Sequence, residues 1–259
     1  MRHDLTTSFL GRLRAHEPAA WFELWENFGP ILRAQFARWG RGRIGQETVQ
    51  DLSQETLTAL TSAIERHDPG RGVRFSTWLL AIARHTLGDE IDRRMAQKRG
   101  AGVRPLSLDA AGAAAGADPG PDGVYENAVF EAKVAAALRA AERDVGFDEF
   151  SVYRLRVLQS QSGRHVAASL GTSEATVSRR LAGVRNRVRE RLIEAFSKYS
   201  FTPEEWQELE RNGLDPNPNK RDEASFDEAV AEIYHRFSQR ETAEGTTGGP
   251  AIARILHRS

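Results

Sequence analysis

Apolar residues recur at helical spacing along most of the chain, and no run of residues alternates as a half-buried β-strand would. The clearest case is GQETVQDLSQETLTALTSAI, residues 45–64. We expect one buried face there, completed by Leu57 or Thr56 and otherwise made of Val49, Leu52, Leu60 and Ile64. The opposite face carries carboxylates, amides and hydroxyls: Thr48, Asp51, Gln54, Glu55, Thr58 and Ser62. It has no cation before Arg66, which is unusual for a solvated helix face.

Two further helices are predicted around this one. An aromatic-rich helix covers Trp21 to Trp39, and Pro30 is expected to bend or restart it. The other begins near Ser76 and ends in the basic pair Arg93-Arg94. The sequence His-Asp-Pro-Gly at residues 67–70 is a strong turn signal before this last helix.

The segment after these helices has a different composition. Residues 100–125 are dominated by Ala, Gly, Pro and Asp, which predicts a flexible linker because such a composition cannot bury a core. A second helical block follows at residues 126–199. In it, residues 163–192 predict a short helix, a turn at Leu170-Gly171-Thr172, and a longer helix capped by Ser173.

The end of the chain adds two helix signals. Thr202 and Glu205 form a capping box with Pro203 at the first helical position. A later amphipathic helix has one apolar side: Phe226, Val230, Ile233 and Phe237. The predicted fold class is therefore all-α, with two small helical domains at 1–99 and 126–199, a linker at 100–125, and a helical extension at 200–259.

Charge is unevenly distributed over the 259 residues, although the formal net charge is zero. Residues 200–259 hold 7 Lys/Arg against 12 Asp/Glu, a net charge of −5, so the remainder carries +5. Between Ser173 and Leu192 there are six arginines and only two glutamates. Such a local basic cluster indicates binding to nucleic acid.

Composition also argues against several other classes. The absence of cysteine excludes disulfides and thiolate chemistry, and no apolar run approaches the roughly 20 residues of a membrane span. The seven histidines are dispersed, and there is no Gly-rich phosphate loop or metal-ligand spacing. We therefore expect a cytoplasmic protein that is not an enzyme and has no cofactor, metal or small-molecule substrate.

Two blocks carry a family resemblance. Residues 18–94 resemble region 2 of a bacterial RNA polymerase sigma factor of the extracytoplasmic-function (ECF) type, through DLSQET at 51–56 and RHDPGRGVRFSTWLLAIARHTLGDEIDRR at 66–94. Residues 152–192 resemble region 4, with its helix-turn-helix. The resemblance implies a factor that directs promoter recognition, melting and transcription initiation. The alternative is a helix-turn-helix regulator that is not a polymerase subunit, which would explain only the second block.

The resemblance assigns roles within region 2. It implies docking on the β′ clamp of core RNA polymerase through the polar face, at Asp51, Gln54 and Glu55. It also implies capture of a flipped base of the minus-ten element by a loop at 67–74 and the helix after it. The candidates are His67, Asp68, Arg71, Arg74, Arg84 and His85. The family more often has Phe and Asn at the two histidine positions, so these side chains either contact bases or are simply polar surface residues.

In region 4, the resemblance implies contact with the β flap and reading of the minus-thirty-five element. The first two turns of a recognition helix touch base edges, which here would involve Thr176, Ser178, Arg179 and Arg180. Arg185 and Arg187 are expected near phosphates, as is Arg189.

One departure from the family suggests a form of control. ECF factors often carry Asp-Ala-Glu-Asp where this chain has Thr48-Val49-Gln50-Asp51, which resembles a subgroup controlled by Ser/Thr kinases. Phosphorylation of Thr48 would add roughly −1.5 to −2 charges at a helix N-terminus, where negative charge is favoured. The alternative is a hydroxyl that caps the helix. The acidic extension could in turn be an interaction module or an autoinhibitory one.

Overall fold

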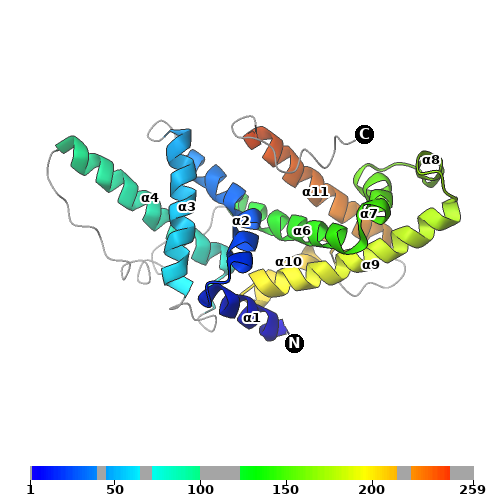
Figure 1. The fold of residues 1–259 in the computed structure, drawn as a ribbon, viewed down its shortest axis with the longest axis horizontal. Helices are drawn as coiled ribbons and strands as arrows, with labels where there is room; N and C mark the ends of the chain where they lie inside the picture. Colours follow the sequence, from blue (N-terminus) through cyan, green and yellow to red (C-terminus); the bar gives the residue numbers. More distant parts are fainter. Residues whose placement is uncertain (1, 40–44, 65–71, 100–122, 215–222, 246–259) are drawn as a thin grey trace. The chain divides into compact units, whose positions relative to one another are not determined.

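The computed structural model describes residues 2–39, 45–64, 72–99, 123–214 and 223–245. Every regular element within these ranges is a helix, which confirms the all-α prediction (Figure 1). Three of the predicted minus-ten contacts, His67, Asp68 and Arg71, lie outside the described residues, as do residues 100–122 of the predicted linker. The chain divides into two compact units, Thr6–Val129 and Met1–Leu5 with Phe130–Ser259.

The unit Thr6–Val129 contains most of α1 (Arg2–Arg14) and all of α2 (Pro18–Trp39), α3 (Gln46–Ile64) and α4 (Phe75–Arg99). Helix α3 packs against both α2 and α4 (Figure 1). The rings of Phe28 and Phe75 meet with centroids 4.8 Å apart, which joins α2 to α4. Helix α2 continues through Pro30 as one element. These contacts bury one face of α3 and leave the other outside the core.

The buried face of α3 follows the predicted pattern with one choice resolved. Val49, Leu52, Leu60 and Ile64 are buried, and the position between them belongs to Thr56 because Leu57 is partly exposed. The Thr56 hydroxyl donates to the Leu52 carbonyl oxygen at 2.8 Å. That bond to the preceding turn satisfies the hydroxyl and allows a polar side chain in an apolar row.

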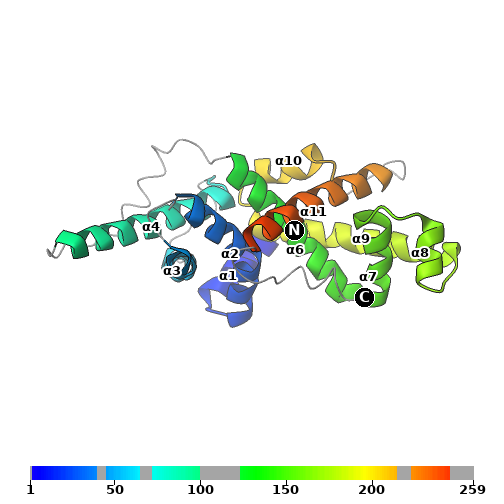
Figure 2. The same cartoon turned by 90° about the horizontal axis from the view of Figure 1, so that it is seen from above.

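The unit from Phe130 onward is built from the rest of α6 (Gly123–Val145) and six further elements. They are α7 (Phe147–Tyr153), the π-helix η3 (Arg154–Leu158), α8 (Gly163–Ser169), α9 (Glu174–Tyr199), α10 (Pro203–Arg211) and α11 (Glu223–Gly245). Figure 2 shows α8 beside the first turns of α9. Helix α6 begins inside the segment predicted as linker.

The turn between α8 and α9 has the predicted geometry. Gly171 has φ 60°, the left-handed conformation that glycine adopts at low cost. Ser173 precedes α9, and its hydroxyl accepts the Thr176 N–H at 3.2 Å. A small cluster of buried side chains holds α8 against α9 and the end of α7: Val152, Val166, Ala167 and Val177.

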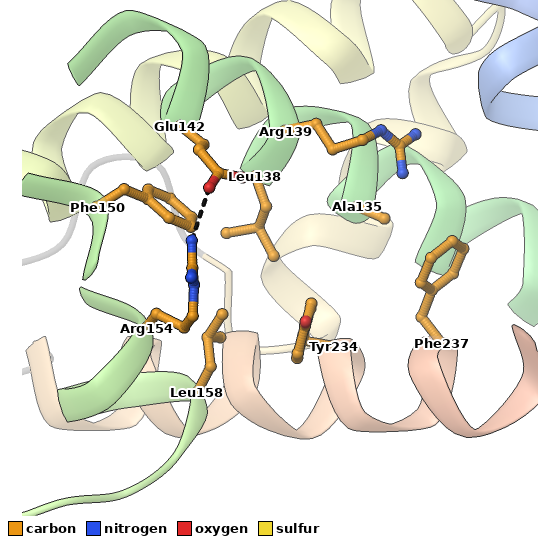
Figure 3. Close-up of a pocket in the computed structure, with 9 residues that line it drawn as sticks. All are labelled: Ala135, Leu138, Arg139, Glu142, Phe150, Arg154, Leu158, Tyr234 and Phe237. Atoms are coloured by element: carbon orange, nitrogen blue, oxygen red, sulfur yellow. Dashed lines mark hydrogen bonds and ion pairs between the residues drawn. The ribbon is translucent and has the colours of Figure 1, made fainter. Parts of the chain in front are cut away.

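The C-terminal extension is packed into this same unit. A set of its apolar side chains is buried: Leu209, Leu214, Phe226, Val230, Ile233 and Phe237. The Lys133 ammonium of α6 lies 3.1 Å from the Glu205 carboxylate of α10, and each side chain is 1% exposed. In Figure 3, Tyr234 and Phe237 of α11 face Leu138 of α6 and Phe150 of α7 across a small pocket. The extension therefore contributes to the core of the unit.

Candidate polymerase and nucleic-acid interfaces

The polar face of α3 is a set of exposed hydrogen-bonding groups. Asp51, Gln54 and Glu55 are all exposed, opposite the buried row. One cation approaches from α4, where Arg93 Nη1 lies 3.9 Å from Glu55 Oε1, and both side chains are about half exposed. An ion pair between exposed groups stabilises little, on the order of 0–1 kcal/mol, so Arg93 does not lock this face. Sequence periodicity along α3 gave no sign of this neighbour on another helix.

Thr48 lies in the first turn of α3 and is partly exposed. The helix begins at Gln46, and the Gly45 carbonyl oxygen accepts the Val49 N–H at 3.1 Å. Gly45 therefore occupies the capping position, and Thr48 lies three residues after it, inside the helix. The N-terminal N–H groups nearby favour added negative charge at Thr48.

Three predicted minus-ten contacts are described, and each has a neighbour. Arg74 Nη1 lies 3.7 Å from Glu126 Oε2, and His85 Nδ1 lies 3.0 Å from Asp89 Oδ2. The Arg84 guanidinium lies over the Trp39 ring, 5.4 Å from its centroid. Arg84 and His85 lie on α4, and Arg74 lies immediately before its first residue.

The start of α9 presents the predicted base-reading residues. Ser178 and Arg179 are exposed, while Thr176 and Arg180 are partly exposed. Within the described part of the chain, neither Arg179 nor Arg180 makes a side-chain hydrogen bond or ion pair. Arg164 on α8 is also exposed and adds a cation that sequence analysis did not single out.

The arginines further along α9 are engaged within the protein. Arg187 Nη1 lies 2.6 Å from Glu190 Oε2, and Arg191 Nε lies 2.6 Å from Asp144 Oδ2. The hydrogen bond from Arg191 is the main cause that holds the pKa of Asp144 below its ordinary value. Arg187 Nε also lies 3.5 Å from Asp144 Oδ2, so the contacts of Arg187 and Arg191 with Asp144 tie the middle of α9 to the end of α6.

The surroundings of Arg185 differ from those predicted from the sequence. It was expected near DNA phosphates, but it is 7% exposed and bonded to α11. Burial disfavours its charged form, but hydrogen bonding and the charge of Asp227 outweigh burial and raise its pKa. The partner lies 42 residues away in sequence, so local spacing could not show it. A phosphate contact by Arg185 thus requires that α11 give up these bonds.

Two features are absent from the described residues. No described helix has the length and apolar character needed to cross a membrane. No group of three or more His, Asp or Glu side chains among the described residues is arranged to hold a metal ion.

Comparison with known proteins found one family match, which covers part of the chain. Residues 24–97 match the family model of sigma-70 region 2, which spans most of α2, all of α3 and nearly all of α4. No curated protein and no solved structure matches the chain. The match over α2–α4 therefore supports a sigma-70 family factor with a role in transcription initiation.

Proposed function

We propose that the protein is an ECF-type sigma factor that docks on the β′ clamp of core RNA polymerase through the polar face of α3. The observation that carries the proposal is the region 2 match, because it includes the whole of α3. Asp51, Gln54 and Glu55 lie together on the exposed side of that helix. Their carboxylates and amide can accept and donate hydrogen bonds to a basic partner without moving any core side chain.

Promoter recognition is divided between the two units in this proposal. Region 2 contacts the melted minus-ten element through the residues before and on α4: Arg74, Arg84, His85, and His67, Asp68 and Arg71 of the preceding segment. The start of α9 reads the minus-thirty-five element, and its unit contacts the β flap. Exposed Arg179 supports this, since an arginine with no side-chain partner among the described residues can offer two donors to a guanine edge.

Control by a Ser/Thr kinase at Thr48 completes the proposal. A phosphate there would place negative charge one turn before Asp51, on the face proposed to dock. Buried Thr56 is a poor kinase substrate because its side chain is fully enclosed. The position of Thr48 in the first turn of α3, rather than at the cap, supports a role other than capping.

Reconstitution with purified core RNA polymerase tests the function. The unmodified protein and Thr48→Glu are each mixed with core polymerase, and transcription from a genomic DNA library is mapped by sequencing RNA 5′ ends. We expect association with core and a defined set of start sites preceded by shared minus-ten and minus-thirty-five sequences. A protein that binds DNA but associates with core in neither form would instead be a helix-turn-helix regulator outside the polymerase.

A further inference from the structure

Arg185 of α9 makes three bonds to two carboxylates of α11. Its Nε and Nη2 lie 3.0 Å and 2.6 Å from the two oxygens of Asp227, and its Nη1 lies 2.8 Å from Glu223 Oε2. The paired contact with Asp227 is a bidentate fork. A guanidinium makes the same paired contact with the oxygens of a phosphate.

Arg189 lies one helical turn after Arg185 on the same face of α9. Its guanidinium stacks over the ring of Phe226 in α11, 4.6 Å from the centroid. Its Nε and Nη2 are buried and have no hydrogen-bond acceptor among the described residues. A buried charged donor without an acceptor lowers stability by about 1–3 kcal/mol or more. An anion bound at this face of α9 could supply the missing acceptor.

The carboxylates that hold Arg185 sit where α11 begins. Glu223 is the first residue of α11 and is 46% exposed, whereas Asp227 is 16% exposed. The apolar anchors of α11 continue for three further turns, through Val230, Ile233 and Phe237. Buried Phe226, which is 2% exposed, also lies in the first turn, so this turn leaves Arg185 only if Phe226 moves with it, while Val230, Ile233 and Phe237 keep the later turns packed.

We propose that Arg185 and Arg189 form a binding site for a backbone phosphate of DNA, which Glu223 and Asp227 occupy in the absence of DNA. Helix α11 then competes with DNA, within the same molecule, for a site on α9, the helix whose first turns read bases. The site rests on the proposed function only in that α9 meets DNA. The alternative is that the ion pair of Arg185 with Glu223 and Asp227 is purely structural and stays intact when DNA binds.

A charge-matched pair of variants tests the site in the full-length chain. Glu223→Gln/Asp227→Asn removes the two carboxylates at Arg185, and Glu228→Gln/Glu232→Gln removes two exposed carboxylates from the same helix. Binding of a labelled random-sequence DNA duplex is followed by fluorescence anisotropy across a salt series. Each added phosphate contact steepens the slope of log K against log salt by about 0.9. We expect the first variant to bind more tightly, with a slope steeper by about one to two, and the control to follow the wild type.

A third variant shows whether the gain comes from Arg185. Adding Arg185→Gln to Glu223→Gln/Asp227→Asn should return the slope to the wild-type value. Equal slopes for Glu223→Gln/Asp227→Asn and its control, or a gain in affinity that survives loss of Arg185, would overturn the site. DNA binding by none of the variants would overturn it as well.

A measurement on the wild type removes any dependence on how well the variants fold. Hydrogen exchange is followed with and without the random duplex, and we expect residues 223–230 to lose protection when DNA is present. Unchanged protection there, with DNA bound elsewhere, would mean that the ion pair is structural. Co-purification of the same variants with core polymerase reports on the proposed function separately, because it does not depend on the salt slope.

Discussion

The six arginines of α9 have the same side chain and different surroundings, and these surroundings decide what each can do. Arg179 and Arg180 have no side-chain partner in the described part of the chain, whereas Arg187 and Arg191 share Asp144 of α6. Arg185 is enclosed by α11. Arg179 and Arg180 can therefore contact bases without breaking a bond within the described part of the chain, so we expect these two residues to discriminate between DNA sequences.

Replacing Arg179 or Arg180 with Ala should lower promoter-specific transcription more than non-specific DNA affinity. Loss of a bidentate base contact costs about 1–3 kcal/mol at that base and relaxes specificity. Arg187→Ala is the control, because it should weaken binding about evenly across sequences and reduce the salt slope by about one. A panel of single-base promoter mutants measures both effects. Similar behaviour of all three variants across the panel would contradict base reading by Arg179 and Arg180.

The double variant Asp51→Ala/Gln54→Ala should weaken association with core polymerase without altering the fold. Both side chains are exposed, and surface changes usually alter stability by less than about 0.5 kcal/mol. Thr58→Ala is a matched control on the same face, since the Thr58 hydroxyl is bonded to its own helix at the Gln54 carbonyl, 3.2 Å away. Pull-down of core polymerase and thermal melting are compared for the three proteins. Undiminished pull-down by the double variant would remove α3 as the docking surface.

At the scale of elements, local pattern predicted the helices well and long-range pairing poorly. The buried row of α3, the turn at Gly171 and the four apolar residues of α11 follow from periodicity and caps, and all are present. Helix α1 was not predicted, because its apolar residues Phe9, Leu10 and Leu13 form one short group in a polar stretch. The ion pairs of α9 and α10 with other helices leave no periodic trace in the sequence.

The N-terminal turn of α3 should act as a switch if Thr48 is phosphorylated. Thr48→Ala should be inactive in cells, and Thr48→Glu should recover part of the activity without a kinase. Recovery should be partial, since a carboxylate supplies one charge and a phosphate supplies nearly two, with three acceptor oxygens. Core polymerase binding by unmodified, phosphorylated and Thr48→Ala protein is the deciding measurement. Full binding by the unmodified and alanine forms would show that no added charge is needed.

The stability of the protein should depend strongly on the ion pair between α6 and α10. Lys133 and Glu205 are each 1% exposed, so Glu205→Ala leaves a buried ammonium without its carboxylate. Breaking such a pair costs about 3–5 kcal/mol. Neighbouring Glu204 is exposed, and Glu204→Ala should cost less than about 0.5 kcal/mol. Urea unfolding compares the two. Glu205 Oε2 also accepts the N–H groups of Phe201 and Thr202 at 2.7 Å and 3.1 Å, so replacement of both Lys133 and Glu205 by apolar residues should recover only the part of the loss that comes from the unpaired ammonium. Equal unfolding midpoints for Glu205→Ala and Glu204→Ala would show that the pair is not essential.

At the scale of the whole molecule, the formal net charge is zero, and opposite charges of the extension and of the rest of its unit meet in specific contacts. The acidic extension supplies Asp227 to Arg185 and Glu205 to Lys133. It also supplies Arg236 and Arg240 to Glu131, whose burial raises the pKa of its carboxyl group despite those two cations. Contacts of both signs join the extension to α6 and α9. The extension is therefore part of the structure that displays the start of α9.

Truncation after Ser200 should accordingly unfold the unit that begins at Phe130. It removes six buried apolar side chains of the extension: Leu209, Leu214, Phe226, Val230, Ile233 and Phe237. At about 1.5–3 kcal/mol each, their loss amounts to about 9–18 kcal/mol, as large as the whole stability of a typical domain, about 5–15 kcal/mol. Lys133 would also lose Glu205.

A chain that ends at Gly245 keeps all of these contacts and is the matched control. Circular dichroism and limited proteolysis should show lost helix and early cleavage between residues 130 and 200 in the shorter chain only. A cooperative melt with the same midpoint in both chains would mean that α6–α9 fold without the extension, which would then pack on an already folded domain.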